Sequence, residues 1–286
     1  MRRARTIAGL RAALESERGR GRIGLVPTMG ALHRGHLELI GSARRECDAV
    51  VVSIFVNPAQ FDDPDDLADY GGDPEADAQA AERAGADVLF VPPAEEMYPE
   101  GFQTWVEVEE LSRGLEGAAR PGHFRAVATV CLKLFNIVRP ARAYFGEKDA
   151  QQAALVERLV RDLNLELEIR VVPTVRDPDN LALSSRNARL SEEERLAARA
   201  LPRALFSAQL AHRRGDDAVA AARAALAEEP LLEPEYVEVA RFEARPILAA
   251  AVRVGRVRLI DNVPLDGDRS PRARQLPTNH PERSST

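Results

Sequence analysis

A histidine pair in a glycine-containing turn is the first feature of this chain whose spacing suggests chemistry. His33 and His36 lie in the run Pro27–His36, between a predicted strand and a predicted helix. Gly30 and Gly35 allow the backbone to turn tightly and to approach a ligand closely. A helix that begins near His36 directs its free N–H groups and positive dipole end at this turn, where two imidazoles could donate hydrogen bonds to phosphate oxygens. One surface histidine beside one core histidine is the plainer alternative, and a zinc site would lack a third ligand nearby.

A second polar turn follows Val50–Val56, a β-branched run long enough for a buried strand. Asn57 and Gln60 carry neutral amides, which offer both donors and acceptors. At the carboxyl end of a strand, such amides can hold a small ligand that carries hydroxyl and carboxylate groups. Taken alone, an ordinary Asn-Pro turn is the favoured interpretation of this segment.

A third turn, Phe145–Asp149, again joins a predicted strand to a predicted helix. Lys148 could neutralise phosphate charge, and Asp149 could accept a hydrogen bond from a ribose hydroxyl. Gln152 lies one helical turn beyond Lys148 and can face the same cleft. A purely structural turn is the alternative here as well.

Two other polar runs could also bind anions. Ser184, Ser185 and Arg186 place two hydroxyls and a guanidinium in a row, which is typical of a phosphate clamp. The run Arg120–Arg125 precedes a predicted helix with two arginines and a histidine. Each run could equally be a solvated polar loop.

The elements that must position these turns are short apolar strands that alternate with helices. Helices are predicted over Leu37–Cys47, Pro74–Gly85 and Val127–Val138, with another between the last two strands. The predicted strands are Ile23–Val26, Val50–Val56, Val88–Val91, Ala143–Gly146 and Leu167–Val172. This order predicts an α/β fold with a Rossmann-like, doubly wound parallel sheet that binds its ligand at the carboxyl ends of the strands. No GxGxxG motif follows a predicted strand and opens a helix, so a dinucleotide site is not supported.

The composition changes after about Arg189, where alanine and arginine become frequent. Ser191 and Glu194 form a capping box at the start of a long helical stretch. A helix over Ala218–Glu228 and strands over Tyr236–Ala240 and Val252–Ile260 complete a smaller C-terminal α+β domain. We therefore expect a first domain over residues 1–175, a second over 176–264, and a disordered tail over 265–286.

Charge and hydropathy exclude several classes of protein. The net charge of −6 argues against a nucleic-acid binder, which would usually carry a basic face. The longest nearly apolar stretch, Ala49–Val56, is far too short to span a membrane. Cys47 and Cys131 belong to no metal-binding or redox motif, so buried cysteines in a reducing compartment are expected. The default expectation is a cytoplasmic protein.

Taken together and in this order, the polar turns closely resemble those of the pantothenate synthetase family. The resemblance is dense from Ile23 to Ser191 and continues more weakly to about Val263. The matching runs are Pro27–His36, Phe55–Phe61, Pro121–Pro140, Phe145–Gln152 and Ser184–Asn187. The resemblance implies an ATP-dependent ligase of the HxGH nucleotidyltransferase superfamily. Such enzymes activate pantoate as a pantoyl-adenylate, releasing pyrophosphate, and join it to β-alanine, releasing AMP. They are typically cytoplasmic homodimers that use ATP with Mg²⁺.

The resemblance also implies roles for individual residues. The ATP-binding residues would be Met29, Gly30, Ala31, Leu32, His33, Arg34, Gly35, His36, Gly146, Glu147, Lys148, Asp149, Val175, Leu183, Ser184, Ser185 and Arg186. The catalytic residues would be His36, as proton donor, with His33, Lys148, Ser184, Ser185 and Arg186. Gln60, Gln152 and Asn57 would bind pantoate, and Gln60 would also border β-alanine. Mg²⁺ would be held mainly by the ATP phosphates, without direct protein ligands.

Three departures from the family pattern stand out. The family usually has Tyr-Pro-Arg where this chain has Tyr70, Gly71 and Gly72, and it usually has glycine at Ala126 and at Asn180. Asn180 is a mild change, because asparagine tolerates positive φ better than most residues. Two rival functions remain: another HxGH enzyme that needs no amide pair, and a non-catalytic protein that binds ATP without releasing pyrophosphate.

Overall fold

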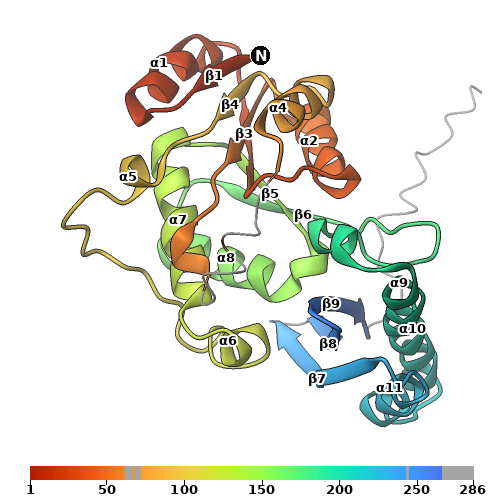
Figure 1. Ribbon diagram of the computed structural model, residues 1–286. Coiled ribbons are helices and arrows are strands. Elements are labelled where there is room, and N and C mark those ends of the chain that lie inside the picture. The colour runs from red at the N-terminus through yellow and green to blue at the C-terminus, as the bar shows by residue number, and fades with distance from the viewer. Residues whose placement is uncertain (62–66, 68–71, 243–244, 266–286) are drawn as a thin grey trace, which may run out of the picture.

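The computed structural model describes residues 1–61, 67, 72–242 and 245–265 (Figure 1). It contains a six-stranded parallel sheet and a separate three-stranded antiparallel sheet. This confirms the predicted α/β fold with a smaller C-terminal α+β unit. The expected domain boundary near residue 175 stays a prediction. Tyr70, Gly71 and the tail after Leu265 lie outside the described residues.

The large sheet has the strand order β1-β4-β3-β2-β5-β6. Its strands are β1 (Arg2–Ala4), β2 (Ile23–Thr28), β3 (Ala49–Ile54), β4 (Val88–Phe90), β5 (Arg142–Gly146) and β6 (Glu168–Val172). From β2 the chain builds outward through β3 and β4, then returns to add β5 and β6 on the other side of β2. The strand order thus reverses between β2 and β5, and this switch point is where open α/β sheets bind ligands. β1 was not predicted, because only one of its three residues is buried.

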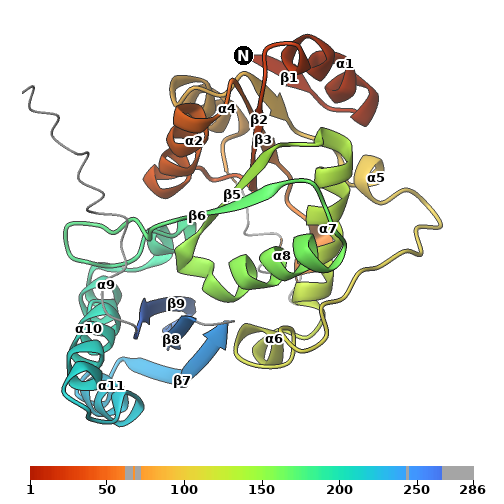
Figure 2. The same cartoon turned by 180° about the vertical axis from the view of Figure 1, so that it is seen from behind.

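Helices cover both faces of this sheet, as the two opposite views show (Figures 1 and 2). Val51 packs in one core with α1 (Ile7–Arg18), α7 (His123–Val138) and α8 (Ala150–Asp162). Val50 and Val52 pack in the other core with α2 (Arg34–Glu46) and α4 (Pro74–Arg83). Successive residues of a strand face opposite sides, so β3 is apolar at every position except Ser53, and all six of its residues are buried.

The C-terminal unit has a core of its own. β7 (Leu232–Phe242), β8 (Arg245–Val254) and β9 (Val257–Pro264) form the antiparallel sheet, which packs against α10 (Ala200–Arg213) and α11 (Ala218–Ala227). The capping box of Ser191 and Glu194 opens α9 (Glu192–Ala198), as predicted.

The prediction of a single strand over Val252–Ile260 was wrong. The chain reverses at Gly255, where φ is +55°, so this run belongs to two strands, β8 and β9. The middle of β8 consists of three alanines, Ala249–Ala251, and alanine has low β-propensity, so this part of the strand gave no strand signal.

Short elements complete the path. They are η1 (Pro58–Gln60), α5 (Ala94–Met97), α6 (Glu116–Ala119), η2 (Glu147–Asp149) and η3 (Ser185–Arg189). Three of them, η1, η2 and η3, contain predicted site residues. Among the described residues, no helix is long and apolar enough to cross a membrane.

Candidate active site

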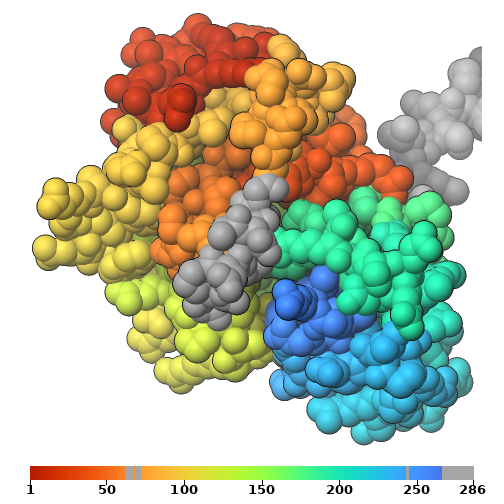
Figure 3. All heavy atoms as spheres, viewed as in Figure 1, coloured from red at the N-terminus to blue at the C-terminus, as the bar shows by residue number. Residues whose placement is uncertain are grey.

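A cavity of about 530 Å³ opens where the carboxyl ends of β2 and β5 meet the C-terminal unit. Most predicted site residues line it: Met29, His33, Gly35, His36, Gln60, Gly146, Lys148, Asp149, Gln152, Val175, Leu183, Ser184, Ser185 and Arg186. One wall is apolar and contains Phe55, Phe124, Val127, Val130 and Leu134. In the space-filling view, the C-terminal unit in teal and blue packs directly against the larger unit (Figure 3). The fold thus brings together turns that lie far apart in the sequence.

The histidine pair forms the N-terminal cap of α2. His33 Nδ1 accepts a hydrogen bond from the Gly35 N–H at 3.1 Å, and the His33 N–H donates to His36 Nδ1 at 3.3 Å. The centroids of the two imidazole rings lie 4.1 Å apart. Because both Nδ1 atoms are acceptors, each neutral ring carries its proton on Nε2, where it can be donated to a ligand.

Both imidazoles are held neutral. Burial, together with the neighbouring His33 and Lys148, lowers the pKa of His36 to about 3. Burial and Lys148 also lower the pKa of His33. These rings therefore act at neutral pH as hydrogen-bond donors rather than as positive charges.

A carboxylate that the sequence analysis missed shapes the backbone before these histidines. Asp77 of α4 is buried, and its oxygens accept hydrogen bonds from Ala31 N at 2.8 Å and from Leu32 N at 2.7 Å. This holds the turn with left-handed backbone at Gly30 (φ +90°) and Ala31 (φ +50°). These three predicted ATP-binding residues, Gly30, Ala31 and Leu32, do not line the cavity, because their backbone forms the supporting turn.

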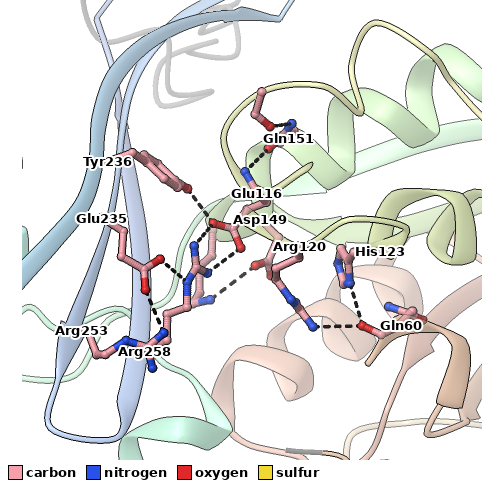
Figure 4. Close-up of polar contacts among 12 residues, drawn as sticks. Gln60, Glu116, Arg120, His123, Asp149, Gln151, Glu235, Tyr236, Arg253 and Arg258 are labelled. Atoms are coloured by element: carbon pink, nitrogen blue, oxygen red, sulfur yellow. Dashed lines mark hydrogen bonds and ion pairs between the residues drawn. The ribbon is translucent and has the colours of Figure 1, made fainter. Parts of the chain in front are cut away.

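Asn57 supports the predicted substrate amide at Gln60. Its side chain is fully buried and donates to Gln60 Oε1 at 2.9 Å, so it lies behind the cavity wall rather than in it. The Gln60 carbonyl contacts Arg120 at 3.0 Å and His123 Nδ1 at 3.1 Å (Figure 4). Burial, with Arg120 nearby, lowers the pKa of His123 to about 4. Arg120 and His123 thus belong to the cavity wall and fix Gln60.

Two consecutive glutamines on α8 have different surroundings. The Gln151 side chain accepts from Glu116 N at 3.1 Å and donates to the carbonyls of Leu111 and Gly114 at 2.8 and 2.9 Å. Its amide is therefore committed to the loop before α6. Gln152 lines the cavity, as its predicted role requires.

The Ser184–Arg186 run lies at the start of η3. Ser184 Oγ accepts from Arg186 N at 3.3 Å, and Leu183 N donates to the Val175 carbonyl at 3.0 Å. Arg34 does not line the cavity, because its guanidinium donates to the Arg176 carbonyl at 2.6 Å and ties α2 to this segment.

The two acidic residues that flank Lys148 in the sequence, Glu147 and Asp149, have different surroundings. Asp149 Oδ1 lies 3.4 Å from Lys148 Nζ, and Glu147, which does not line the cavity, accepts a long hydrogen bond of 3.4 Å from Thr174 N. Within the described part of the chain, no group of three His, Cys, Asp or Glu side chains could hold a metal ion.

The structure explains Gly72 and Asn180 among the family departures, and nothing in it explains alanine at position 126. A Cβ atom at Gly72 would lie 2.9 Å from Ala31 N, so this glycine permits close contact with the turn at Gly30 and Ala31. Asn180 has φ +67°, a left-handed conformation that asparagine tolerates. Ala126 is buried, and its carbonyl lies 3.5 Å from the Asn57 amide.

A charged cluster joins the C-terminal sheet to α6 (Figure 4). Arg258 of β9 makes two hydrogen bonds of 2.7 Å to the Glu116 carboxylate, which also accepts from the Tyr236 hydroxyl at 2.8 Å. Burial alone would raise the pKa of Glu116, but Arg258 and Tyr236 outweigh it and hold that pKa below its ordinary value. Glu235 joins Arg258 to Arg253.

Comparison with known proteins places this site in a family. Residues 2–264 match the model of the pantoate–β-alanine ligase family. The chain belongs to this family. Pantothenate synthetase from Acidobacterium capsulatum is 51% identical, over 92% of this chain and 96% of that protein. Pantothenate synthetase from Chloroflexus aurantiacus is 54% identical, over 86% of this chain and 92% of that protein.

Solved structures of pantoate–β-alanine ligases have the same fold. Pantothenate synthetase from Thermus thermophilus superposes with a TM-score of 0.88 at 47% identity, covering 93% of this chain and 99% of that one. The ligase from Francisella tularensis, described as complexed with β-γ ATP and β-alanine, has a TM-score of 0.80 at 36% identity, covering 94% of this chain and 100% of that one.

Proposed function

We propose that this enzyme joins pantoate to β-alanine at the expense of ATP, through a pantoyl-adenylate. One observation carries the proposal: phosphate-binding groups and a pair of amides line the same cavity. His33, His36 and Lys148 supply donors for phosphate oxygens, while Gln60 and Gln152 can hold a hydroxy acid. The family membership and the ligands named for the Francisella enzyme support the same substrates.

In the first half-reaction, a pantoate carboxylate oxygen attacks the α-phosphorus of ATP. The bond from that phosphorus to the bridging oxygen breaks, and pyrophosphate leaves with the electron pair. Positioning and charge stabilisation should dominate this step. Lys148 and Arg186 supply positive charge, the Nε2–H groups of His33 and His36 donate hydrogen bonds, and the hydroxyls of Ser184 and Ser185 do the same. The family pattern assigns His36 as proton donor, and because its ring is neutral it would act here by donating a hydrogen bond from Nε2–H.

In the second half-reaction, the neutral amine of β-alanine attacks the acyl carbon. The acyl–oxygen bond breaks and AMP leaves with the electron pair, while the amine gives up a proton to solvent as the amide forms. No covalent enzyme nucleophile is needed. Cys131 lines the cavity, but burial raises the pKa of its thiol to about 12, so it stays protonated. The C-terminal unit limits access of water to the mixed anhydride.

Magnesium enters this scheme with the nucleotide. Mg²⁺ prefers oxygen ligands in octahedral geometry and is usually held by one or two carboxylates together with phosphates and water. The Asp149 carboxylate, which lines the cavity beside Lys148, fits an ion that takes most of its ligands from ATP and water. Bound there, Mg²⁺ would neutralise phosphate charge. We also propose, from the family pattern, that the enzyme is cytoplasmic and that it forms a homodimer. Sedimentation analysis would test the dimer.

Transfer of heavy oxygen tests the chemistry. Pantoate labelled with heavy oxygen in its carboxylate should deliver one labelled atom to AMP, because that oxygen bridges the acyl and phosphoryl groups in the adenylate. Label in inorganic phosphate, with ADP as product, would instead indicate an acyl-phosphate. Turnover of ATP without any response to pantoate would favour another HxGH enzyme.

A further inference from the structure

Strand β9 contains two consecutive buried polar residues, Asp261 and Asn262. Asp261 and Asn262 are only 2% and 6% exposed, and the nearby residues Leu259 and Val263 belong to the core of the C-terminal unit. Burying polar groups is unfavourable unless they find hydrogen-bond partners. Their partners therefore indicate what these residues do.

Asp261 fixes β9 against the segment that leads into the cavity. Its two oxygens accept hydrogen bonds of 2.7 and 2.9 Å from the Arg176 guanidinium. That guanidinium also lies over the Phe206 ring of α10, 4.9 Å from its centroid. The strand is thus held in place immediately beside Asn262.

Asn262 reaches from this strand to the predicted nucleotide turn. Its Nδ2 donates to the Glu147 carbonyl at 3.0 Å and to the Lys148 carbonyl at 2.8 Å. A carboxamide has two N–H groups, so both are used on one turn of η2. Residues more than 110 apart in sequence are joined by these bonds, which lie directly at the backbone of Lys148.

The orientation of this backbone determines where the lysine side chain points. Lys148 lines the cavity, and its side chain is 19% exposed. A catalytic group must be held within about 0.5 Å and 10–20° of its productive geometry, which requires supporting hydrogen bonds. The long, flexible lysine stem cannot supply that precision alone.

We propose that Asn262 is a positioning residue for adenylate formation, which holds the η2 turn so that Lys148 meets the ATP phosphates. This inference rests on the proposed function, in which Lys148 contacts the triphosphate. The C-terminal sheet then contributes to the first half-reaction through a defined contact, in addition to covering the site.

The test is Asn262→Ala, measured by pantoate-dependent exchange of labelled pyrophosphate into ATP. A misplacement of about 1 Å can cost roughly a hundredfold in rate, so a loss of that order is expected. The matched control is Tyr236→Phe, which removes a hydrogen bond between the same sheet and α6. This control should keep exchange within about twofold of the parent, because it leaves the Lys148 turn untouched.

A double-mutant cycle with Lys148→Ala separates positioning from general loosening of the fold. If Asn262 acts through Lys148, adding Asn262→Ala to Lys148→Ala should change the rate by no more than about twofold. Fully multiplicative losses would overturn the proposal, as would an equal loss in Tyr236→Phe or unimpaired exchange in Asn262→Ala.

Two further measurements keep the result interpretable. If Asn262→Ala unfolds early in a thermal melt, Asn262→Ser, which retains one donor, takes its place. The exchange rate of Asn262→Ser should lie below that of the parent enzyme, by less than the roughly hundredfold loss expected for alanine. Parental exchange in Asn262→Ser would count against the inference. A parent enzyme that shows no exchange would refute the proposed function itself, whereas an active parent with an unimpaired Asn262 variant refutes only the positioning role.

Discussion

Replacing Asp77 by asparagine should weaken ATP use without touching any group in the cavity. The buried Asp77 carboxylate accepts two short hydrogen bonds from Ala31 N and Leu32 N. Asparagine keeps one acceptor and turns an NH₂ group toward the other N–H. The loss of one hydrogen bond to a charged group costs about 1.5–3 kcal/mol. If the turn must recover its shape before ATP binds, kcat/KM for ATP should fall by roughly ten- to a hundredfold.

The assay is pyrophosphate exchange at varied ATP concentration, with thermal melts alongside. Asp73→Asn is the matched control, because Asp73 caps the same helix, α4, and accepts from Glu75 N and Ala76 N. Asparagine caps helices as well as aspartate does, so this variant should behave like the parent. An unchanged kcat/KM in Asp77→Asn, or an equal loss in Asp73→Asn, would refute the reasoning.

Three other perturbations follow from the site. Lys148→Ala should lower the exchange rate about a hundredfold, near 3 kcal/mol, and near-normal exchange would remove Lys148 from the phosphate site. The pKa of His36 is about 3 in the folded chain against an ordinary value of 6.5, so the unfolded chain takes up the proton first. The free energy of unfolding should therefore fall as pH drops below about 6.5, and His36→Gln should make this slope shallower in urea titrations at several pH values. Glu116→Gln breaks a largely buried pair with Arg258 and should destabilise the enzyme by about 3 kcal/mol. An unchanged melting temperature would show that the cluster adds no stability.

Local sequence patterns predicted five of the six strands of the large sheet and the turns at their ends. β3 is apolar at almost every position because both of its faces are covered, and such a run identifies a central parallel strand. Once the strands are known to be parallel, Gln60, Lys148 and the histidine pair must meet at one edge. That part of the site follows from strand geometry, and the cavity contains all of these residues.

Contacts between distant segments could not be predicted in the same way. Asp77 meets Ala31 across 46 positions, and no spacing rule connects a carboxylate on α4 with that turn. Asn57 and Gln60 gave the same signal, yet only Gln60 reaches the cavity, because burial directs Asn57 inward. The hairpin at Gly255 was missed since the apolar residues on either side of it resemble one continuous strand.

The most direct test of the proposed chemistry is exchange of labelled pyrophosphate into ATP with pantoate and Mg²⁺ but without β-alanine. A reversible pantoyl-adenylate predicts exchange that depends on pantoate. Addition of β-alanine should then yield pantothenate and AMP. Folded, ATP-binding enzyme that shows no exchange under these conditions would contradict the adenylate mechanism.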